Sequence, residues 1–107
     1  MNSIRLLASF NFNEEPATEN GKVANVLFSR GEQKLFEVKL SNAETLARHT
    51  ASSPITVLCL AGSGVFRAGN DLEDEQRLTP GLLIALDAGV AHEVVAEPVL
   101  HILVTKF

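Results

Sequence analysis

Short apolar runs separated by turn residues recur along almost the whole chain. The clearest runs are Ile4 to Phe12, Val23 to Ser29, Leu35 to Leu40, Ile55 to Leu60 and Val99 to Thr105. Gly, Pro, Asn and Asp residues interrupt them every eight to twelve residues. Strand-length runs with this spacing are typical of an all-β sandwich or barrel. We therefore predict six to eight antiparallel strands.

Helical periodicity is weak throughout the chain. The strongest helical competitor is Asn42 to His49, which follows Ser41 and has Glu44 in position for a capping box. Its apolar residues do not continue as a stripe, so we predict a strand from Leu46 to Ser53 that carries His49. The sequence Gly62-Ser63-Gly64 predicts a sharp bend or a β-bulge. Pro98 is expected to separate the stretch before it from a last strand.

Length and charge narrow the class of protein. A chain of 107 residues is predicted to form a single domain, residues 1–107. Its net charge of −4 and scattered basic residues argue against nucleic acid and against a charged membrane surface as partners. No apolar run approaches the roughly 20 residues of a membrane span. The beginning of the chain lacks a signal-peptide layout, and Cys59 is the single cysteine, so we expect a cytoplasmic protein.

The stretch from Gly81 to Ala96 has the most informative pattern in the chain. An apolar run leads into Asp87-Ala88-Gly89, and His92 opens a second apolar run. This is the pattern of strand, tight turn and strand, with glycine favoured at Gly89 if the turn requires a positive φ. An imidazole is thereby predicted at the mouth of the second strand.

This stretch resembles the second conserved motif of the cupin superfamily. In that motif a glycine, Pro-x-Gly, a histidine and an asparagine follow at fixed spacing, and Gly81, Gly89 and His92 fall on it. Asp87 stands in place of the proline and Ala96 in place of the asparagine. The resemblance implies a small cupin of type 2, which is an antiparallel double-stranded β-helix or jelly-roll barrel.

The first cupin motif is present in degenerate form. Counting back from Gly62 places His49 on its first histidine, Ala51 on its second histidine and Ile55 on its glutamate. Ala43 takes the position of its leading glycine, so the resemblance covers about residues 43–105. Two of the four metal ligands of the family are therefore replaced by side chains that cannot coordinate a metal.

Strand alternation then predicts the pocket. His49 and Ala51 share one face of a strand, as do Ile55 and Val57, and as do His92 and Val94. In the register that the resemblance implies, all of these side chains point into the barrel. The predicted ligand pocket is His49, Ala51, Ile55, Val57, His92 and Val94. The same two histidines form a predicted partial metal site.

Three functions are compatible with such a pocket. The first is binding of a small organic molecule by apolar walls and two histidines. The second is a metal-dependent enzyme of the dioxygenase or isomerase type, which the resemblance implies; it would use a weakly bound divalent Zn, Ni, Fe or Mn. The third is a structural or regulatory homodimer with a vestigial pocket. Loss of one histidine and the glutamate favours the first and third, so enzymatic activity stays open.

Several other features have mainly structural interpretations. His101 is either a third polar pocket residue or a residue of the surface or a subunit contact. Cys59 is expected to pack in the core. The acidic residues Asp71 to Glu75 lack the pattern of a calcium loop and are expected to be solvated. The apolar runs near both chain ends predict a homodimer that covers their outer faces.

Overall fold

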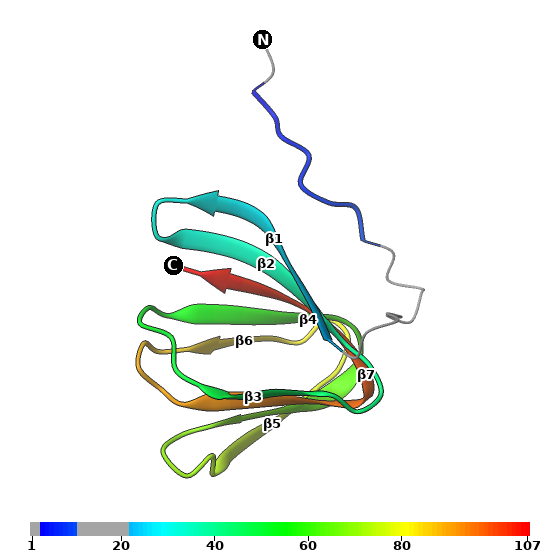
Figure 1. The fold of residues 1–107 in the computed structure, drawn as a ribbon, viewed down its shortest axis with the longest axis vertical. Helices are drawn as coiled ribbons and strands as arrows, with labels where there is room; N and C mark the ends of the chain where they lie inside the picture. The colour runs from blue at the N-terminus through cyan, green and yellow to red at the C-terminus, as the bar shows by residue number, and fades with distance from the viewer. Residues whose placement is uncertain (1–2, 11–21) are drawn as a thin grey trace.

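The computed structural model describes residues 3–10 and 22–107, and every regular element in these residues is a β-strand. The strands are β1 (Lys22–Arg30), β2 (Gln33–Leu40), β3 (Thr45–His49), β4 (Ile55–Ala68), β5 (Asp74–Leu78), β6 (Leu83–Leu86) and β7 (His92–Lys106). All of their pairings are antiparallel. The predicted all-β jelly-roll class is therefore confirmed (Figure 1).

The two long strands β4 and β7 build both walls of the barrel. The later part of β7 pairs with β2 and with the beginning of β4, whereas its first part pairs with the end of β4 and with β3. The first wall contains β2, the end of β7 and the beginning of β4, and β6 extends it along β4. The second wall contains β3, the beginning of β7 and the end of β4, and β5 extends it along β4. The order β1-β2-β7-β4-β5 leaves β1 as an edge strand.

The predicted bend at Gly62-Ser63-Gly64 is confirmed, and it is where β4 passes from one wall to the other. The pairing register with β7 shifts between Cys59 and Ala61 and again between Gly62 and Gly64. Gly62 has a φ of 79°, and a Cβ atom there would collide with the backbone carbonyl of Val99. Only glycine accepts both the positive φ and this close approach of two backbones.

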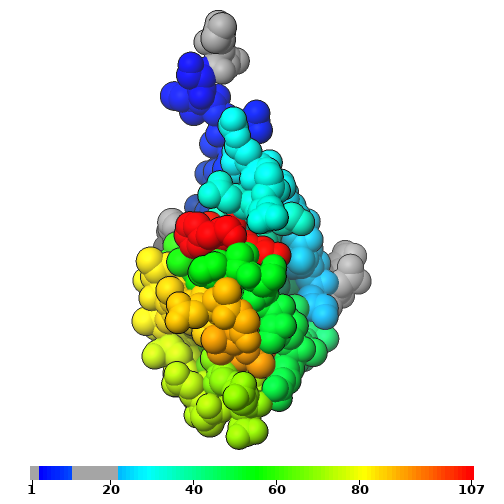
Figure 2. Space-filling view, turned by 90° about the vertical axis from the view of Figure 1, so that its left-hand side faces the viewer, coloured from blue at the N-terminus to red at the C-terminus, as the bar shows by residue number. Residues whose placement is uncertain are grey.

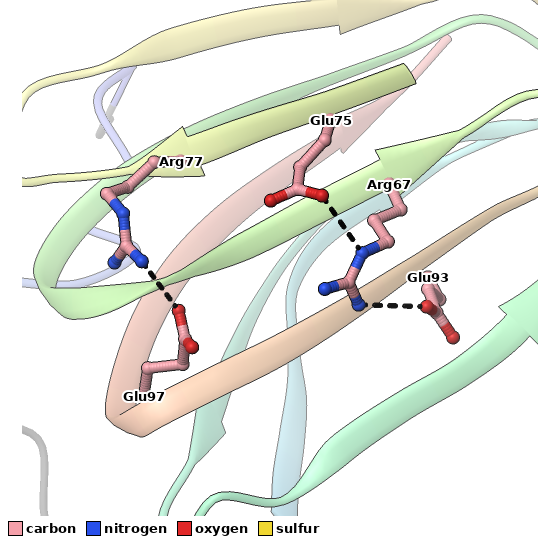
Figure 3. Close-up of polar contacts among 5 residues, drawn as sticks. All are labelled: Arg67, Glu75, Arg77, Glu93 and Glu97. Atoms are coloured by element: carbon pink, nitrogen blue, oxygen red, sulfur yellow. Dashed lines mark hydrogen bonds and ion pairs between the residues drawn. The ribbon is translucent and has the colours of Figure 1, made fainter. Parts of the chain in front are cut away.

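Strand alternation directs one set of side chains into an apolar interior and the other set to the outer faces. Inward residues of β2, β4 and β7 are almost completely buried: Val38, Leu40, Val57, Cys59, Val94, Leu100 and Ile102. On the outer face of the second wall, Arg67 of β4 lies between Glu75 of β5 at 3.4 Å and Glu93 of β7 at 3.3 Å (Figure 3). Arg77 and Glu97 form a further ion pair at 3.2 Å on this face.

Several predicted boundaries differ from the structure. Strand β3 ends at His49, four residues before the predicted end at Ser53. Pro98 does not divide the last stretch, because β7 continues through it from His92 to Lys106. The predicted strand Ile4 to Phe12 is not formed over residues 3–10, and residues 11 and 12 lie outside the described part of the chain.

Residues 3–10 form an extended segment that lies outside the barrel and runs away from it toward the N-terminus (Figure 1). Ile4 is 90% exposed and Leu6 is 84% exposed. Near the end of the segment, the Phe10 ring contacts the His101 ring edge-on, with centroids 5.5 Å apart. Among the residues that the structure describes, no helix is long and apolar enough to cross a membrane.

Candidate functional site

A cavity of about 340 Å³ opens between the two walls of the barrel, and we call it the barrel cavity. Its lining is Val26, Lys34, Phe36, Leu46, His49, Thr50, Ala51, Ile55, Val57, Phe66, His92, Val94, Ile102, Val104 and Lys106. Most of these side chains are apolar. Figure 2 shows the side of the molecule on which the C-terminal residues, in red, and the beginning of β7, in orange, lie.

The structure brings all six predicted pocket residues to this one cavity. His49 and Ala51 come from β3 and the turn after it, Ile55 and Val57 from β4, and His92 and Val94 from β7. On β4 and β7 these side chains are also buried, since Ile55 is 7% exposed and His92 is 2% exposed. Motif spacing therefore predicted which side chains lie together.

A β-bulge in β3 places the two histidines opposite each other. Leu46 pairs with Val94, and the register shifts before His49 pairs with His92. An unbroken register would have put Arg48 opposite His92, because antiparallel partners change by one residue in opposite directions. The extra residue turns His49 into the barrel cavity. The two imidazole centroids are 4.1 Å apart, with an angle of 62° between the rings.

Backbone carbonyls orient both imidazole rings in the same way. Nδ1 of His49 is 2.9 Å from the carbonyl oxygen of Ala47, and Nδ1 of His92 is 3.0 Å from that of Val90. A carbonyl oxygen only accepts, so each Nδ1 carries the proton and donates it. In the neutral rings, each Nε2 then holds a lone pair that can accept a hydrogen bond or bind a metal.

The environment of His92 favours its neutral form. Burial lowers the pKa of His92, and the nearby His49 lowers it further, although the hydrogen bond to Val90 acts in the opposite direction. The His92 ring also stacks on Phe66, with an angle of 11° and centroids 5.5 Å apart. At neutral pH His92 therefore offers an uncharged acceptor within an apolar wall.

The residues present do not fit a complete transition-metal site. Such sites normally use three or four protein ligands. Within residues 3–10 and 22–107, no three His, Cys, Asp or Glu side chains come close enough to hold one ion. Ala51 and Ile55, at the positions of the missing ligands, have no donor atoms. His49 and His92 supply two imidazoles and nothing further.

His101 and Cys59 lie away from the barrel cavity. His101 points to the outer face of β7, where its Nε2 is 2.9 Å from Oε2 of Glu37. It is therefore not a third pocket histidine. His101 is nine residues after His92 in the continuous strand β7, and side chains an odd number of residues apart on a strand point to opposite faces. Cys59 is buried, and desolvation raises the pKa of its thiol, as expected for core packing.

The sequence interpretation missed nine of the lining residues, and four of these change the chemistry of the cavity. Phe36 and Phe66 supply aromatic surface, and Lys34 and Lys106 bring two ammonium groups to its rim. Alternation along β2 is a signal that points to Lys34, since it shares a face with Phe36 and the buried Val38. The signal is weak because a lysine at the end of a strand more often faces water.

Solved structures with the same architecture cover nearly all of this chain. A cupin superfamily protein from Desulfitobacterium hafniense is 14% identical, with a TM-score of 0.79 over 100% of this chain and 93% of its own. An RmlC-like cupin protein from Desulfovibrio desulfuricans is 20% identical, with a TM-score of 0.72 over 98% and 94%. A conserved protein of unknown function from Streptococcus pyogenes is 17% identical, with a TM-score of 0.75 over 98% and 90%.

These similarities define the fold and leave the activity open. No family model matches the sequence, and no curated protein matches it. These neighbours are described as cupin proteins, and they share the architecture of this chain over nearly all of its length. The chain therefore folds as a small cupin domain.

Proposed function

We propose that this protein binds a small organic molecule in the barrel cavity. The observation that supports this function is the convergence of His49 and His92 on a cavity whose other walls are mainly apolar. Its volume of about 340 Å³ lies at the lower end of the range of roughly 300–1,000 Å³ for ligand sites. An apolar pocket with a few convergent polar groups is the usual form of such a site.

The two histidines define one requirement on the ligand. Both present Nε2 lone pairs when neutral, because their Nδ1 protons are donated to backbone carbonyls. A hydroxyl or amide N–H of the ligand would satisfy these acceptors, and the apolar walls would cover its hydrocarbon part. Stacking against Phe66 and packing in β7 hold His92 in place, which reduces the entropy lost on binding.

Metal-dependent catalysis has less support than binding. In that function a dioxygenase or isomerase would use the ion to activate oxygen, water or the substrate. The incomplete ligand set favours a site that works through hydrogen bonds and apolar contact. We therefore assign no catalytic residue.

Homodimer formation is a second proposal, carried by the extended segment at residues 3–10. Ile4 and Leu6 are almost completely exposed, and Arg5 between them lies over the Phe28 ring of the edge strand β1. Exposed apolar segments beside an open sheet edge associate readily with another chain. We propose that a second copy of this chain covers them. A dimer is compatible with ligand binding and with a purely structural role.

Binding is tested by a fluorinated-fragment screen with ¹⁹F NMR. The probes are small aliphatic and aromatic alcohols, amides and acids, screened against the protein and against Ala51→Phe, which places a ring in the cavity. The matched control is Ala47→Phe on the exposed face of β3. Binding that Ala51→Phe abolishes and Ala47→Phe retains supports the function. Absence of binding by every class, or equal binding to both variants, would contradict it.

A further inference from the structure

Two lysines lie side by side at the rim of the barrel cavity. Lys34 of β2 and Lys106 of β7 are directly paired in the register of these strands. Both occupy inward positions, since Phe36 and Val104 follow them toward the interior on the same face and also line the cavity. Lys34 is exposed and Lys106 is half-buried, so both lining lysines are accessible to solvent.

This arrangement is unfavourable without an anion. Like charges directly opposite each other on one face of an antiparallel pair are destabilising. Within the described part of the chain, neither lysine forms an ion pair with a carboxylate. Among the residues that the structure describes, no Asp or Glu lines the barrel cavity, although the chain has 13 acidic and nine basic residues.

The acidic residues near these strands face the opposite direction. Glu37, on β2 between two inward residues, points to the outer face and pairs with His101. Glu75, Glu93 and Glu97 lie on the outer face of the other wall, where they pair with arginines (Figure 3). In the described part of the chain, the fold therefore separates charge, with these carboxylates on the outer faces and two lysines without a carboxylate partner at the cavity.

The two walls of the cavity also carry different polar groups. Lys34 and Lys106 belong to the wall formed by β2 and the end of β7, whereas His49 and His92 belong to the wall formed by β3 and the beginning of β7. Apolar side chains such as Ile55 and Val57 line the cavity from the beginning of β4, next to the lysine-bearing end of β7. Neutral imidazoles accept hydrogen bonds, so the lysines are the groups suited to a negative charge.

We propose that the ligand of the barrel cavity is a small amphiphilic organic anion. Its carboxylate, or another singly charged acidic group, lies between Lys34 and Lys106, and its apolar body extends along Ile55 and Val57 toward the histidines. This inference rests on the proposed binding function and specifies its ligand class. It also explains why an acidic protein concentrates two cations at the mouth of an otherwise apolar pocket.

The test compares carboxylates with the primary amides of the same acids. The probes are hydroxyl-bearing acids, the ω-hydroxyhexanoyl, ω-hydroxyoctanoyl, ω-hydroxydecanoyl, hydroxyphenylacetyl and hydroxynaphthoyl pairs, with dissociation constants measured by calorimetry at low salt. We expect at least one carboxylate to bind about tenfold more tightly than its amide, since each rim ion pair contributes modestly. Lys34→Met together with Lys106→Met should abolish this preference. Lys39→Met, on the other face of β2, is the charge-matched control and should retain it.

The outcomes separate the two proposals. Equal affinity of acids and amides for the wild-type protein would overturn the anion inference and leave the binding function standing. A preference that survives the double lysine variant would also overturn it. Binding of no pair would count against the binding function itself, and the anion inference would fall with it. Loss of the preference as salt rises, with amide binding unchanged, would support the electrostatic origin.

Discussion

His49 and His92 are paired across β3 and β7 because β3 contains one extra residue. Without that bulge Arg48 would oppose His92, and His49 would turn away from the interior. The pairing brings the two imidazole centroids within 4.1 Å, while Ala47 and Val90 hold both Nδ1 atoms. An irregularity in one short strand thus creates the polar end of an otherwise apolar cavity.

Folding stability should fall on mild acidification because of His92. Burial lowers the pKa of His92 in the folded protein below its ordinary value of 6.5. The unfolded chain then binds more protons between these two pKa values, so the free energy of unfolding decreases as pH falls below about 6.5. Urea unfolding between pH 8 and pH 5 measures this loss. The pKa of Glu37 is also lowered, from 4.5, so its contribution is lost at lower pH.

His92→Leu should flatten this pH dependence, because it replaces the titrating imidazole by an apolar side chain that still fills the buried position. Val94→Ala is the matched control: it should lower stability by about 2 kcal/mol or less at every pH through lost packing, and retain the slope. A slope that persists in His92→Leu would show that another group is responsible.

Gly62 and Gly89 should differ in their response to valine. Both have a φ of 79°, which a β-branched residue tolerates badly. At Gly89 the space for a side chain is open, so Gly89→Val should cost roughly 1–3 kcal/mol from backbone strain alone. At Gly62 the backbone of Val99 blocks a Cβ atom, so Gly62→Val should cost more. Thermal melting measures both, and equal melting temperatures for the two variants would contradict the close approach of β4 and β7.

The extended segment should control the oligomeric state. We expect sedimentation equilibrium at micromolar concentration to give twice the chain mass. Ile4→Ser combined with Leu6→Ser should shift this mass toward that of one chain, because it removes the exposed apolar surface that a second copy would cover. Ala47→Ser, at an exposed position of β3, is the control and should leave the mass unchanged. A wild-type mass of one chain would rule out the dimer.

The sequence predicted the barrel and the positions of the two motif histidines because turn chemistry and motif spacing are local signals. It did not predict the direction of His101, because a strand break was expected at Pro98. In the structure β7 continues past Pro98, and alternation places His101 outward. The bulge before His49 and the lysine pair at the rim depend on pairing between distant strands, which no local pattern encodes.

The metal content of the purified protein should be lower than that of a protein with a complete cupin metal centre. Two imidazoles hold a divalent ion weakly, and the apolar Ile55 raises the cost of leaving an ion at that position. We therefore expect elemental analysis of the dialysed protein to find transition metal well below one ion per chain, and chelation to leave the melting temperature nearly unchanged. A stoichiometric metal that survives dialysis, with a large loss of stability on its removal, would revive the metalloenzyme function.

The gain-of-function counterpart restores the missing ligands. Ala51→His combined with Ile55→Glu adds an imidazole and a carboxylate at cavity positions that correspond to the family's ligands. With His49 and His92 they make four donors, enough for a zinc or nickel ion. We expect this double variant to hold about one ion per chain, to gain thermal stability when loaded, and to lose the ion on His92→Ala. If the double variant stays metal-free while remaining folded, then the barrel geometry, and not only the two lost side chains, has departed from a metal centre.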